Sequence, residues 1–413
     1  MPMKRALIPI IILLAAGMAS AQQQAVDMSF YTQEFNRTGA TVYELLDILR
    51  AVRDENQEGI GSFYNNAART FLNRLPNFAG NRERLAVEEC SRLLLRGIAA
   101  EKHTESAQYV WTLLHYFDIV HQQNDGYLMY EAFVAMGEIG AKDYATNLAN
   151  YLYHYNDSAT PEFQTKIKIH RVVPGIINAL EALHEPVGVK PVFFVSIGWY
   201  DTDVKEVAST ALPNIMDDPG EIISEIIRDP FNGPSIKNTA WQEMLRTKAS
   251  NASKAKVAAV ALETSYTFIA PSRESQSVLR SMRMSAIDTI RLMGIEDDSV
   301  YAFLERTYRE AFDTPYTDFE VITLVVRTLA AVKTEEAVDL LTEFLRVLHS
   351  RRRSGPWGIS ERDIMQIIIP AIANTETKSR LAVQLLTVIQ NSSLYTNAEQ
   401  TWARNALSRL TGR

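Results

Sequence analysis

The chain has 413 residues, of which 46% are hydrophobic and 22% are charged. These proportions are ordinary for a folded protein and exclude an intrinsically disordered chain. The formal net charge of −7 also disfavours nucleic-acid binding, because contacts to phosphates need clustered positive charge. We therefore expect no nucleic-acid partner.

Residues 1–21 have the three-part layout of a secretory signal peptide. The basic start MPMKR precedes the apolar run ALIPIIILLAAGM, and Ala19-Ser20-Ala21 forms a cleavage site of small residues. The apolar run has 13 residues, fewer than the roughly 20 that a membrane-spanning helix needs. We predict cleavage after Ala21, which removes two basic residues and leaves a net charge of −9. The mature chain is then expected in a bacterial periplasm or outside the cell, without a membrane-spanning segment.

The next segment, residues 22–40, is polar and weakly patterned, and we predict that it is flexible. Helical signals begin at residue 41. Thr41 and Glu44 have the spacing of a capping box, in which hydroxyl and carboxylate each accept from an unpaired backbone N–H. The signature recurs at Thr317–Glu320, Ser360–Asp363 and Thr396–Glu399, and a cap residue precedes a proline at Thr160-Pro161 and Asp218-Pro219. We predict roughly 18 helices joined by short turns.

Cys90 is the only cysteine and lies in AVEECSRLLLRG, which has a helical pattern. We favour a small buried hydrophobic side chain at this position. A reactive thiol or an intermolecular disulfide stays open as the alternative, because exported proteins usually carry paired cysteines or none.

Aromatic and histidine side chains are concentrated in residues 109–155, with Tyr151, Tyr153, His154 and Tyr155 at the end of this segment. One interpretation is an aromatic groove that stacks on sugar rings or holds a peptide. The alternative is that most of these rings pack in the core with their polar ends at its edge. Because steps of two residues rotate about 200° around a helix, we expect at least one of the three tyrosines to be exposed.

The segment VKPVFFVSIGWY (189–200) has the composition of a buried strand, but helical patterns flank it on both sides. We therefore predict a helix. Further along, HSRRRSGPWGIS (349–360) places Arg351, Arg352 and Arg353 in a Gly-Pro loop beside Trp357. This positive charge could bind a cell-wall polymer or another anionic surface. It could equally complement the negative C-terminus of the preceding helix.

A helix-pair pattern returns along the chain. It appears in FVAMGEIGAKDYATNLANYL (133–152), AIDTIRLMGIEDDSVYAFLE (286–305) and VVRTLAAVKTEEAVDLLTEFL (325–345). Each stretch reads as the end of one apolar helix, a short turn and a second apolar helix. The spacing of about 33 to 43 residues is typical of stacked helix pairs, with one degenerate unit expected within 234–270.

These stretches resemble the HEAT-repeat family through MGEIGAKDYA, LEALHEPVGV, RLMGIEDDSV and LAAVKTEEAV. The resemblance implies an all-α fold, a right-handed αα superhelix of the HEAT or armadillo kind. It covers residues 126–413, and residues 41–125 are expected to hold degenerate repeats. Since helical solenoids usually bind other macromolecules on an extended surface, it also implies a scaffold or adaptor for another protein.

Known catalytic motifs are missing from the sequence, including HExxH, GxSxG, the P-loop and GxGxxG. His115 and His121 are six residues apart, which is a poor spacing for two metal ligands on a helix. We therefore predict a non-enzymatic protein without a metal or cofactor. The alternative is a glycan or cell-wall polymer binder, or a helical carbohydrate-active enzyme with Asp118, Asp125 and Glu131 as its nearest carboxylates.

Overall fold

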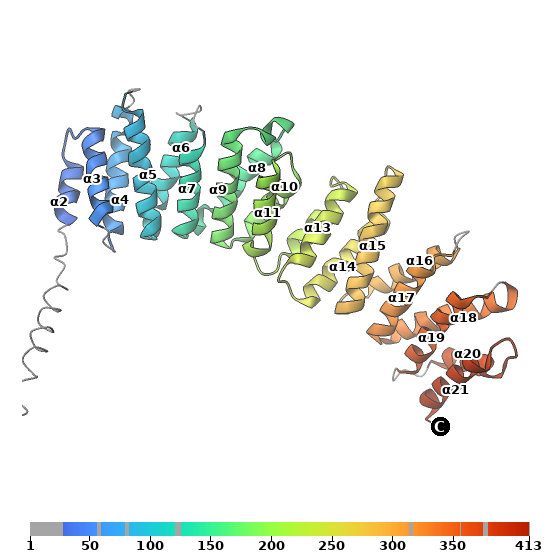
Figure 1. The fold of residues 1–413 in the computed structure, drawn as a ribbon. Helices are drawn as coiled ribbons and strands as arrows, with labels where there is room; N and C mark the ends of the chain where they lie inside the picture. The colour runs from blue at the N-terminus through green and yellow to red at the C-terminus, as the bar shows by residue number, and fades with distance from the viewer. Residues whose placement is uncertain are drawn as a thin grey trace, which may run out of the picture. The chain divides into compact units, whose positions relative to one another are not determined.

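The structure is a computed structural model that describes residues 28–55, 59–78, 82–119, 125–313, 317–355, 357–374 and 379–412. The predicted signal peptide and its cleavage site lie outside these ranges. Across the described ranges the chain is all-α, with twenty α-helices, a few short 3₁₀ turns and no strand (Figure 1). None of the described helices combines the length and the apolar character needed to cross a bilayer.

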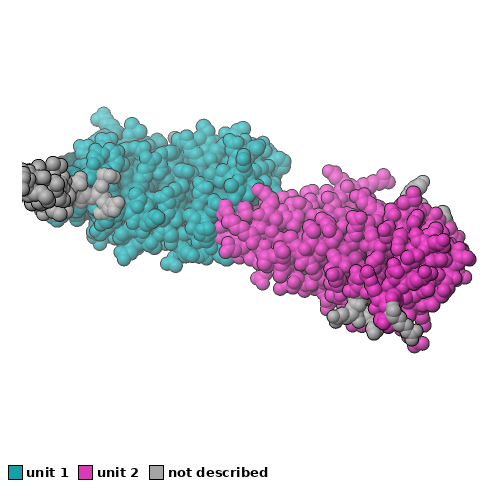
Figure 2. Space-filling model, turned by 60° about the horizontal axis from the view of Figure 1, so that its bottom comes forward, with its two compact units in different colours: residues 1–211 teal, residues 212–413 magenta. Residues whose placement is uncertain are grey.

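Two compact units divide the chain, residues 1–211 and residues 212–413 (Figure 2). The helices of unit 1 are α2 (Met28–Asn36), α3 (Val42–Glu55), α4 (Gly61–Arg74), α5 (Arg84–Ala100), α6 (Ala107–Ile119), α7 (Tyr127–Glu138), α8 (Ala145–Asp157), α9 (Ile167–Leu183) and α10 (Val189–Ile197). Helix α11 (Thr202–Ile215) contains the division between the units.

Unit 2 continues the alternation of helices and short turns. Its helices are α12 (Gly220–Arg228), α13 (Pro234–Arg246), α14 (Asn251–Thr267), α15 (Arg273–Met293), α16 (Ser299–Asp313), α17 (Phe319–Val332), α18 (Glu335–Ser354), α19 (Ile359–Ala373), α20 (Arg380–Asn391) and α21 (Asn397–Thr411).

Each unit is built from two layers of helices, because helices two apart in the chain lie side by side. In unit 1 the helices α3, α5, α7 and α9 pack in succession, and α4 packs between α2 and α6. In unit 2 the even helices from α12 to α20 form one layer and the odd helices from α13 to α21 form the other. Consecutive helices pair across the layers, so the apolar face of each pair is covered by its neighbours.

The core lies between the layers. Leu94, Leu114, Phe133 and Leu148 of successive helices in unit 1 are fully buried there. At Gly137 the helices α7 and α9 approach so closely that an added Cβ would lie 2.9 Å from the Cα of Ala179. The close packing of α7 and α9 therefore explains why glycine occupies position 137, within the repeat at 133–152.

Several predicted element boundaries hold. The segment 189–200 contains α10, as predicted, and not a strand. Thr41 and Glu44 form the expected capping box: Glu44 Oε2 accepts from Thr41 N at 2.7 Å, and Thr41 Oγ1 accepts from Glu44 N at 3.3 Å. Thr396 and Glu399 do the same at the start of α21.

Other boundaries differ from the prediction. Residues 28–36 form α2 within the segment that we expected to be flexible, and Phe35 is buried against Phe63 at 6.1 Å between ring centres. The N-cap of α17 is Asp318, one residue after the predicted Thr317. At α19 the carboxylate of Glu361 accepts from the N–H of Gly358, two residues before the predicted cap.

The compact units divide at 211/212. Helices α5 and α7 pack together across residues 125/126, where the sequence separates degenerate repeats from clear ones. Residues 234–270, which we expected to hold a degenerate unit, contain α13 and α14, and these pack on their neighbours as other helix pairs do. The sequence of this segment departs from the repeat motif, but its two helices still pack as a pair.

Candidate functional site

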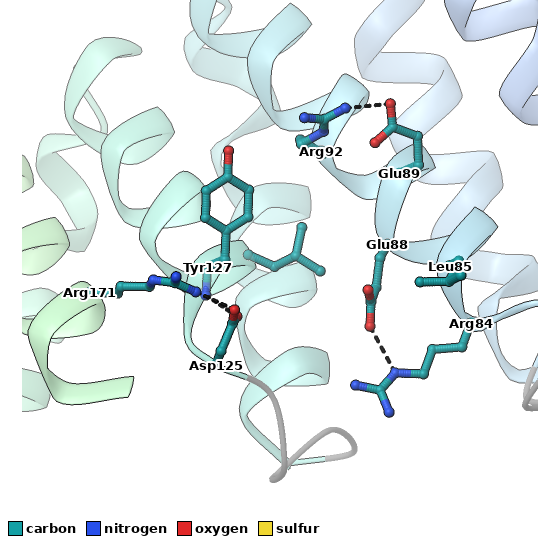
Figure 3. A pocket seen from close by; sticks show the side chains of 9 residues that line it. Arg84, Leu85, Glu88, Glu89, Arg92, Asp125, Tyr127 and Arg171 are labelled. Atoms are coloured by element: carbon teal, nitrogen blue, oxygen red, sulfur yellow. Dashed lines mark hydrogen bonds and ion pairs between the residues drawn. The ribbon is translucent and has the colours of Figure 1, made fainter. Parts of the chain in front are cut away.

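A charged pocket of about 630 Å³ lies on unit 1, where α5, α7 and the start of α9 meet (Figure 3). We call it the unit 1 pocket. It is lined by Arg84, Leu85, Glu88, Glu89, Arg92, Asp125, Tyr127, Leu128 and Arg171. Nearly all of these side chains are charged or aromatic, and Leu85 is 78% exposed.

Ion pairs organise the lining. On α5, Glu88 Oε1 accepts from Arg84 Nε at 2.8 Å, across one helical turn. One turn further, Glu89 Oε1 accepts from Arg92 Nη2 at 2.5 Å. Helix α5 therefore contributes both positive and negative side chains to the pocket. Each arginine and glutamate keeps further polar atoms that a ligand could contact.

The opposite wall of the pocket is formed by Asp125, Tyr127 and Arg171 (Figure 3). Arg171 donates to Asp125, and its guanidinium lies 5.8 Å from the centre of the Tyr127 ring. Burial by itself would raise the pKa of Asp125, but the N–H of Tyr127 and the Arg171 guanidinium outweigh it, so the pKa is lowered. Asp125 is therefore held as a carboxylate.

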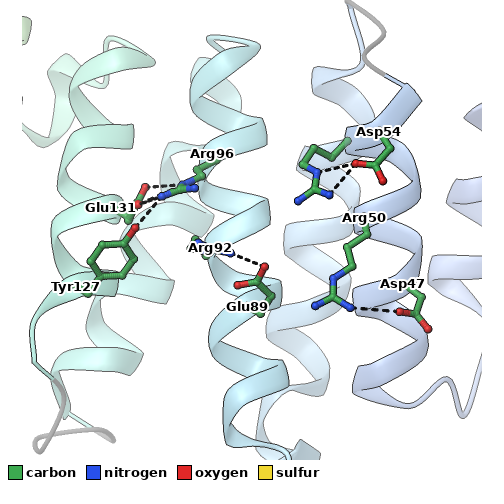
Figure 4. Close-up of polar contacts among 9 residues, drawn as sticks. Asp47, Arg50, Asp54, Glu89, Arg92, Arg96, Tyr127 and Glu131 are labelled. Carbon is green, nitrogen blue, oxygen red and sulfur yellow. Dashed lines mark hydrogen bonds and ion pairs between the residues drawn. The ribbon is translucent and has the colours of Figure 1, made fainter.

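Tyr127 also joins the pocket to a second ion pair. Its hydroxyl accepts from Arg96 Nη2 at 2.7 Å, and Arg96 Nη2 lies 2.5 Å from Glu131 Oε1 (Figure 4). Burial opposes ionisation of Glu131, yet hydrogen bonds from Arg96 and Tyr127 and the charge of Arg96 lower its pKa. Next to it, Arg92 Nε is buried and has no hydrogen-bond partner among the described residues.

The row of ion pairs extends to α3. Arg50 lies 3.7 Å from Asp47, and Arg53 lies 2.7 Å from Asp54. Figure 4 shows α3, α5 and α7 presenting these residues in one view, and α5 packs against both of its neighbours. The three packed helices α3, α5 and α7 thus carry ion-paired side chains beside the pocket.

The sequence did not predict this pocket. The spacing of Arg84 and Glu88, and of Glu89 and Arg92, is visible in the chain, but such pairs usually lie on an ordinary solvated helix face. These α5 side chains share a pocket with Tyr127 and Arg171 only because α5, α7 and α9 stack together. The only sign of the pocket in the sequence was the series of charged residues Arg84, Glu88, Glu89 and Arg92 along α5.

Part of the predicted aromatic groove is a packed cluster. The ring of half-buried Trp111 lies 4.9 Å from His115, 5.4 Å from Tyr144 and 5.7 Å from Tyr151, between ring centres. The Tyr151 hydroxyl donates to Asp118 Oδ2 at 3.2 Å. Burial and this carboxylate raise the pKa of Tyr151.

The remaining predicted aromatic residues do not join that cluster. Tyr155 is half-buried against Phe163, 6.5 Å between ring centres, and burial raises its pKa. Tyr153 is also half-buried, whereas His154 is exposed. All three tyrosines are therefore half-buried, and the exposed member of the group is His154 rather than a tyrosine.

Arg351, Arg352 and Arg353 lie on the last turn of α18 and not in a loop, which corrects the prediction. The helix includes all three arginines and ends at Ser354. Trp357 follows it, 6.3 Å from Tyr395 between ring centres.

Two of the three arginines hold the structure together. Arg351 Nη1 donates to Thr317 Oγ1 at 3.0 Å, and Arg352 Nε donates to the carbonyl oxygen of Leu394 at 2.9 Å. The Arg352 guanidinium also lies 4.8 Å from the Trp357 ring centre. Arg353 is exposed. The cationic segment therefore leaves one outward-facing arginine.

Cys90 is fully buried on α5, and its thiol lies 3.6 Å from the carbonyl oxygen of Val42. Burial raises its pKa to about 12. The prediction of a small buried side chain is confirmed, and the reactive alternative is disfavoured because the thiolate is the reactive form.

In the part of the chain that the structure describes, no three His, Cys, Asp or Glu side chains gather in a way that could hold a metal ion. His121 lies outside the described residues. No family model matches the chain, and no curated protein is significantly similar to it in sequence.

Proposed function

We propose that the chain is an exported, non-enzymatic helical-repeat protein that binds another protein in a bacterial periplasm or cell envelope. It would be a HEAT-like right-handed solenoid that acts as a scaffold or adaptor. The repeated pairing of helices in two layers supports this proposal, because such stacks present long surfaces made from many short units.

The observation that carries the proposal is the unit 1 pocket. Successive helices bring arginines, carboxylates and Tyr127 to one surface, and Leu85 adds exposed apolar area at its rim. Arginine and tyrosine are enriched among the residues that dominate protein interfaces. Alternating charge favours a partner segment that carries both signs, since matched charges set orientation and exclude wrong partners.

The charges also argue for binding rather than for hydrolysis. A glycosidase needs one carboxylic acid with a raised pKa beside a second carboxylate. Asp118 lies 3.2 Å from Lys168 Nζ, and the pKa values of Asp125 and Glu131 are lowered by their arginine partners despite burial. Asp125 and Glu131 are therefore held as carboxylates, and Asp118 is paired with Lys168.

A comparison of charge-reversed variants tests this function. The double variant Glu88→Lys with Arg171→Glu reverses one charge on each wall of the pocket, and we expect it to lose the protein that the wild-type chain retains from an envelope extract. Arg346→Glu breaks an exposed ion pair in unit 2 and serves as the matched control. Equal recovery of the same partner by all three proteins would refute the assignment of the pocket.

Export is tested separately. Cell fractionation of the full chain should place a shortened product, beginning at residue 22, in the periplasm or medium. A full-length product retained in the cytoplasm would contradict the proposed location.

The alternative of glycan binding rests on the cluster around Trp111. Trp111 is half-buried beside Tyr144 and Tyr151, so part of an aromatic surface reaches solvent. Co-sedimentation with insoluble cell-wall polymer tests it: a glycan binder would sediment, and Trp111→Ala would not. If neither protein sediments, the alternative is excluded.

A further inference from the structure

Unit 2 has one edge formed by the turns that join each even-numbered helix to the next odd-numbered helix. In chain order the described parts of these turns are residues 229–233, 268–272, 317–318, 355, 357–358 and 392–396. Together with the helix residues that flank them directly, we call them the turn edge. The ends of α13, α15 and α18 that carry such turns lie on the same side of unit 2 in Figure 1.

Side-chain contacts link the first three turns. Lys237 Nζ donates to the carbonyl oxygen of Asp229 at 2.5 Å and lies 5.0 Å from the ring centre of Phe268 in the next turn. Arg280, the eighth residue of α15, donates to Asp318 in the turn after that. The first two turns are therefore neighbours in space, and α15 connects them to the third.

The later turns are linked in the same way. Arg351, at the end of α18, donates to Thr317 at 3.0 Å, and Arg352 donates to the carbonyl oxygen of Leu394 at 2.9 and 2.8 Å. The turn edge is thus a continuous line from the α12–α13 turn to the α20–α21 turn.

Large apolar side chains are exposed along this line. Phe231 is 95% exposed, Ile269 is 91% exposed, Ile359 is 79% exposed and Leu394 is 42% exposed. Single exposed apolar residues are normal on protein surfaces. Here they occur at turns of four hairpins on one edge, and the first two project almost completely into solvent.

The charge of the turn edge differs from that of the opposite edge. Arg273 and Arg353 are exposed beside the apolar turns, and so is one carboxylate, Glu274. The turns at the other end of the helices carry two exposed lysines, Lys248 and Lys333, and five exposed carboxylates, which are Asp217, Asp218, Glu296, Asp297 and Asp298. An anionic surface is therefore repelled more strongly by that edge of unit 2 than by the turn edge.

We propose that unit 2 docks by its turn edge onto an anionic lipid bilayer. The apolar side chains enter the boundary between headgroups and acyl chains, and Arg273 and Arg353 contact lipid phosphates. The acidic opposite edge then faces away from the membrane. This contact is separate from the unit 1 pocket and does not depend on it.

The form of the surface favours a bilayer over a protein partner. Protein interfaces have a close-packed core surrounded by a polar rim. The side chains of Phe231 and Ile269 instead project singly from turns, and the lipid interface accepts single projecting residues because it is fluid. A protein contact at this edge is the outcome that would replace the proposal.

Vesicle co-sedimentation tests the proposal with the chain from residue 22 onward. This chain retains every described residue and lacks the apolar run in residues 1–21, which would bind lipid by itself. We expect it to sediment with vesicles of equimolar phosphatidylcholine and phosphatidylglycerol, and much less with phosphatidylcholine alone. Added salt should weaken the binding, because exposed charges are screened.

Substitutions locate the contact. The double variant Phe231→Ser with Ile269→Ser should lower vesicle affinity on the order of tenfold, since two apolar side chains no longer enter the lipid. Arg353→Ser should reduce binding to the anionic vesicles only. Leu292→Ser removes a side chain that is 64% exposed at the other end of α15, and we expect it to leave binding unchanged.

Three results would overturn the proposal. The first is a wild-type chain that sediments with neither kind of vesicle. The second is a Phe231→Ser/Ile269→Ser variant that binds as the wild type does. The third is a Leu292→Ser variant that weakens binding as much as the double variant. If no vesicle binds and a photo-reactive residue at position 231 instead joins the chain to a protein, the turn edge is a protein contact. Loss of partner binding at the unit 1 pocket would leave the vesicle result unaffected.

Discussion

Lys237 is a buried charge whose position has a clear physical cause. Its side chain is 1% exposed, and Nζ donates to the carbonyl oxygens of Ile227 and Asp229 at 2.5 Å each. These carbonyls lie at the end of α12, where helical carbonyl groups lack partners within the helix. Burial lowers the pKa of Lys237, and the charge of Asp229 offsets this only in part.

The lowered pKa predicts a pH dependence of stability. The folded state binds the Lys237 proton more weakly than the unfolded state does, so protonation penalises folding at neutral pH. This penalty is lost as the pH rises toward the unfolded pKa of about 10.4. Compared with Lys237→Met, the free energy of unfolding of the wild type should therefore increase between neutral pH and that value. Urea unfolding of both proteins measures the difference, and a constant or falling difference would contradict the account.

Cys90 gives a second prediction at this scale. Because the thiol is fully buried and its pKa is raised to about 12, the native protein should not react with iodoacetamide at pH 8. Reaction should follow unfolding, as mass spectrometry of samples with and without denaturant would show. Rapid modification of the native chain, or a disulfide-linked dimer, would contradict the buried position.

At the scale of the element, caps and apolar patterns predicted much of the fold. The capping boxes at Thr41 and Thr396 and the helix within 189–200 follow from local chemistry. Helix α2 was missed because its stability comes from the packing of Phe35 on a later helix. The arginines of α18 were assigned to a loop because Ser354, Gly355 and Pro356 follow them in the sequence, whereas the helix continues until Ser354.

Gly137 tests the packing of neighbouring helices. An alanine Cβ there would lie 2.9 Å from the Cα of Ala179, so the backbones of α7 and α9 would have to separate. Overpacking costs about 1–3 kcal/mol, and the better helix propensity of alanine returns up to about 1 kcal/mol. We expect Gly137→Ala to lower the free energy of unfolding by about 1–2 kcal/mol.

The matched control is Gly233→Ala. No atom lies within 4 Å of the added Cβ, and Gly233 is the N-cap of α13. Alanine is a poorer N-cap than glycine, so we expect Gly233→Ala to lower the free energy of unfolding by about 0.5–1 kcal/mol, less than Gly137→Ala. Chemical denaturation of both variants decides the point, and equal effects at the two glycines would show that close packing at α7 and α9 is not the cause.

For the whole molecule, stacking explains both what the sequence predicted and what it did not. The alternation of helices and turns was visible in the chain, since each helix carries its own apolar pattern. The unit 1 pocket was not visible in the sequence, because Glu88 and Arg171 are far apart in the chain. They line one pocket only because α5, α7 and α9 stack in that order. The contacts of Arg351 with Thr317 and of Arg352 with Leu394 likewise depend on how neighbouring helices stack.

Nearest-neighbour packing predicts that damage stays local. Gly137→Ala should speed amide hydrogen exchange in α7 and α9 and leave the exchange of α17 and α19 unchanged, because repeats contact mainly their neighbours. Exchange measured by mass spectrometry on peptides from both units would show this. A uniform increase throughout the chain would mean that it unfolds as one cooperative body.

Site-specific photo-crosslinking from the unit 1 pocket tests the central claim most directly. A photo-reactive residue at Leu85, which is exposed at the rim, should join the chain to one envelope protein, and the same residue at Leu292 should not. The adduct should disappear when Glu88→Lys and Arg171→Glu are added. Absence of an adduct from position 85, or an adduct that survives the reversed charges, would contradict the proposal that this pocket binds a protein partner.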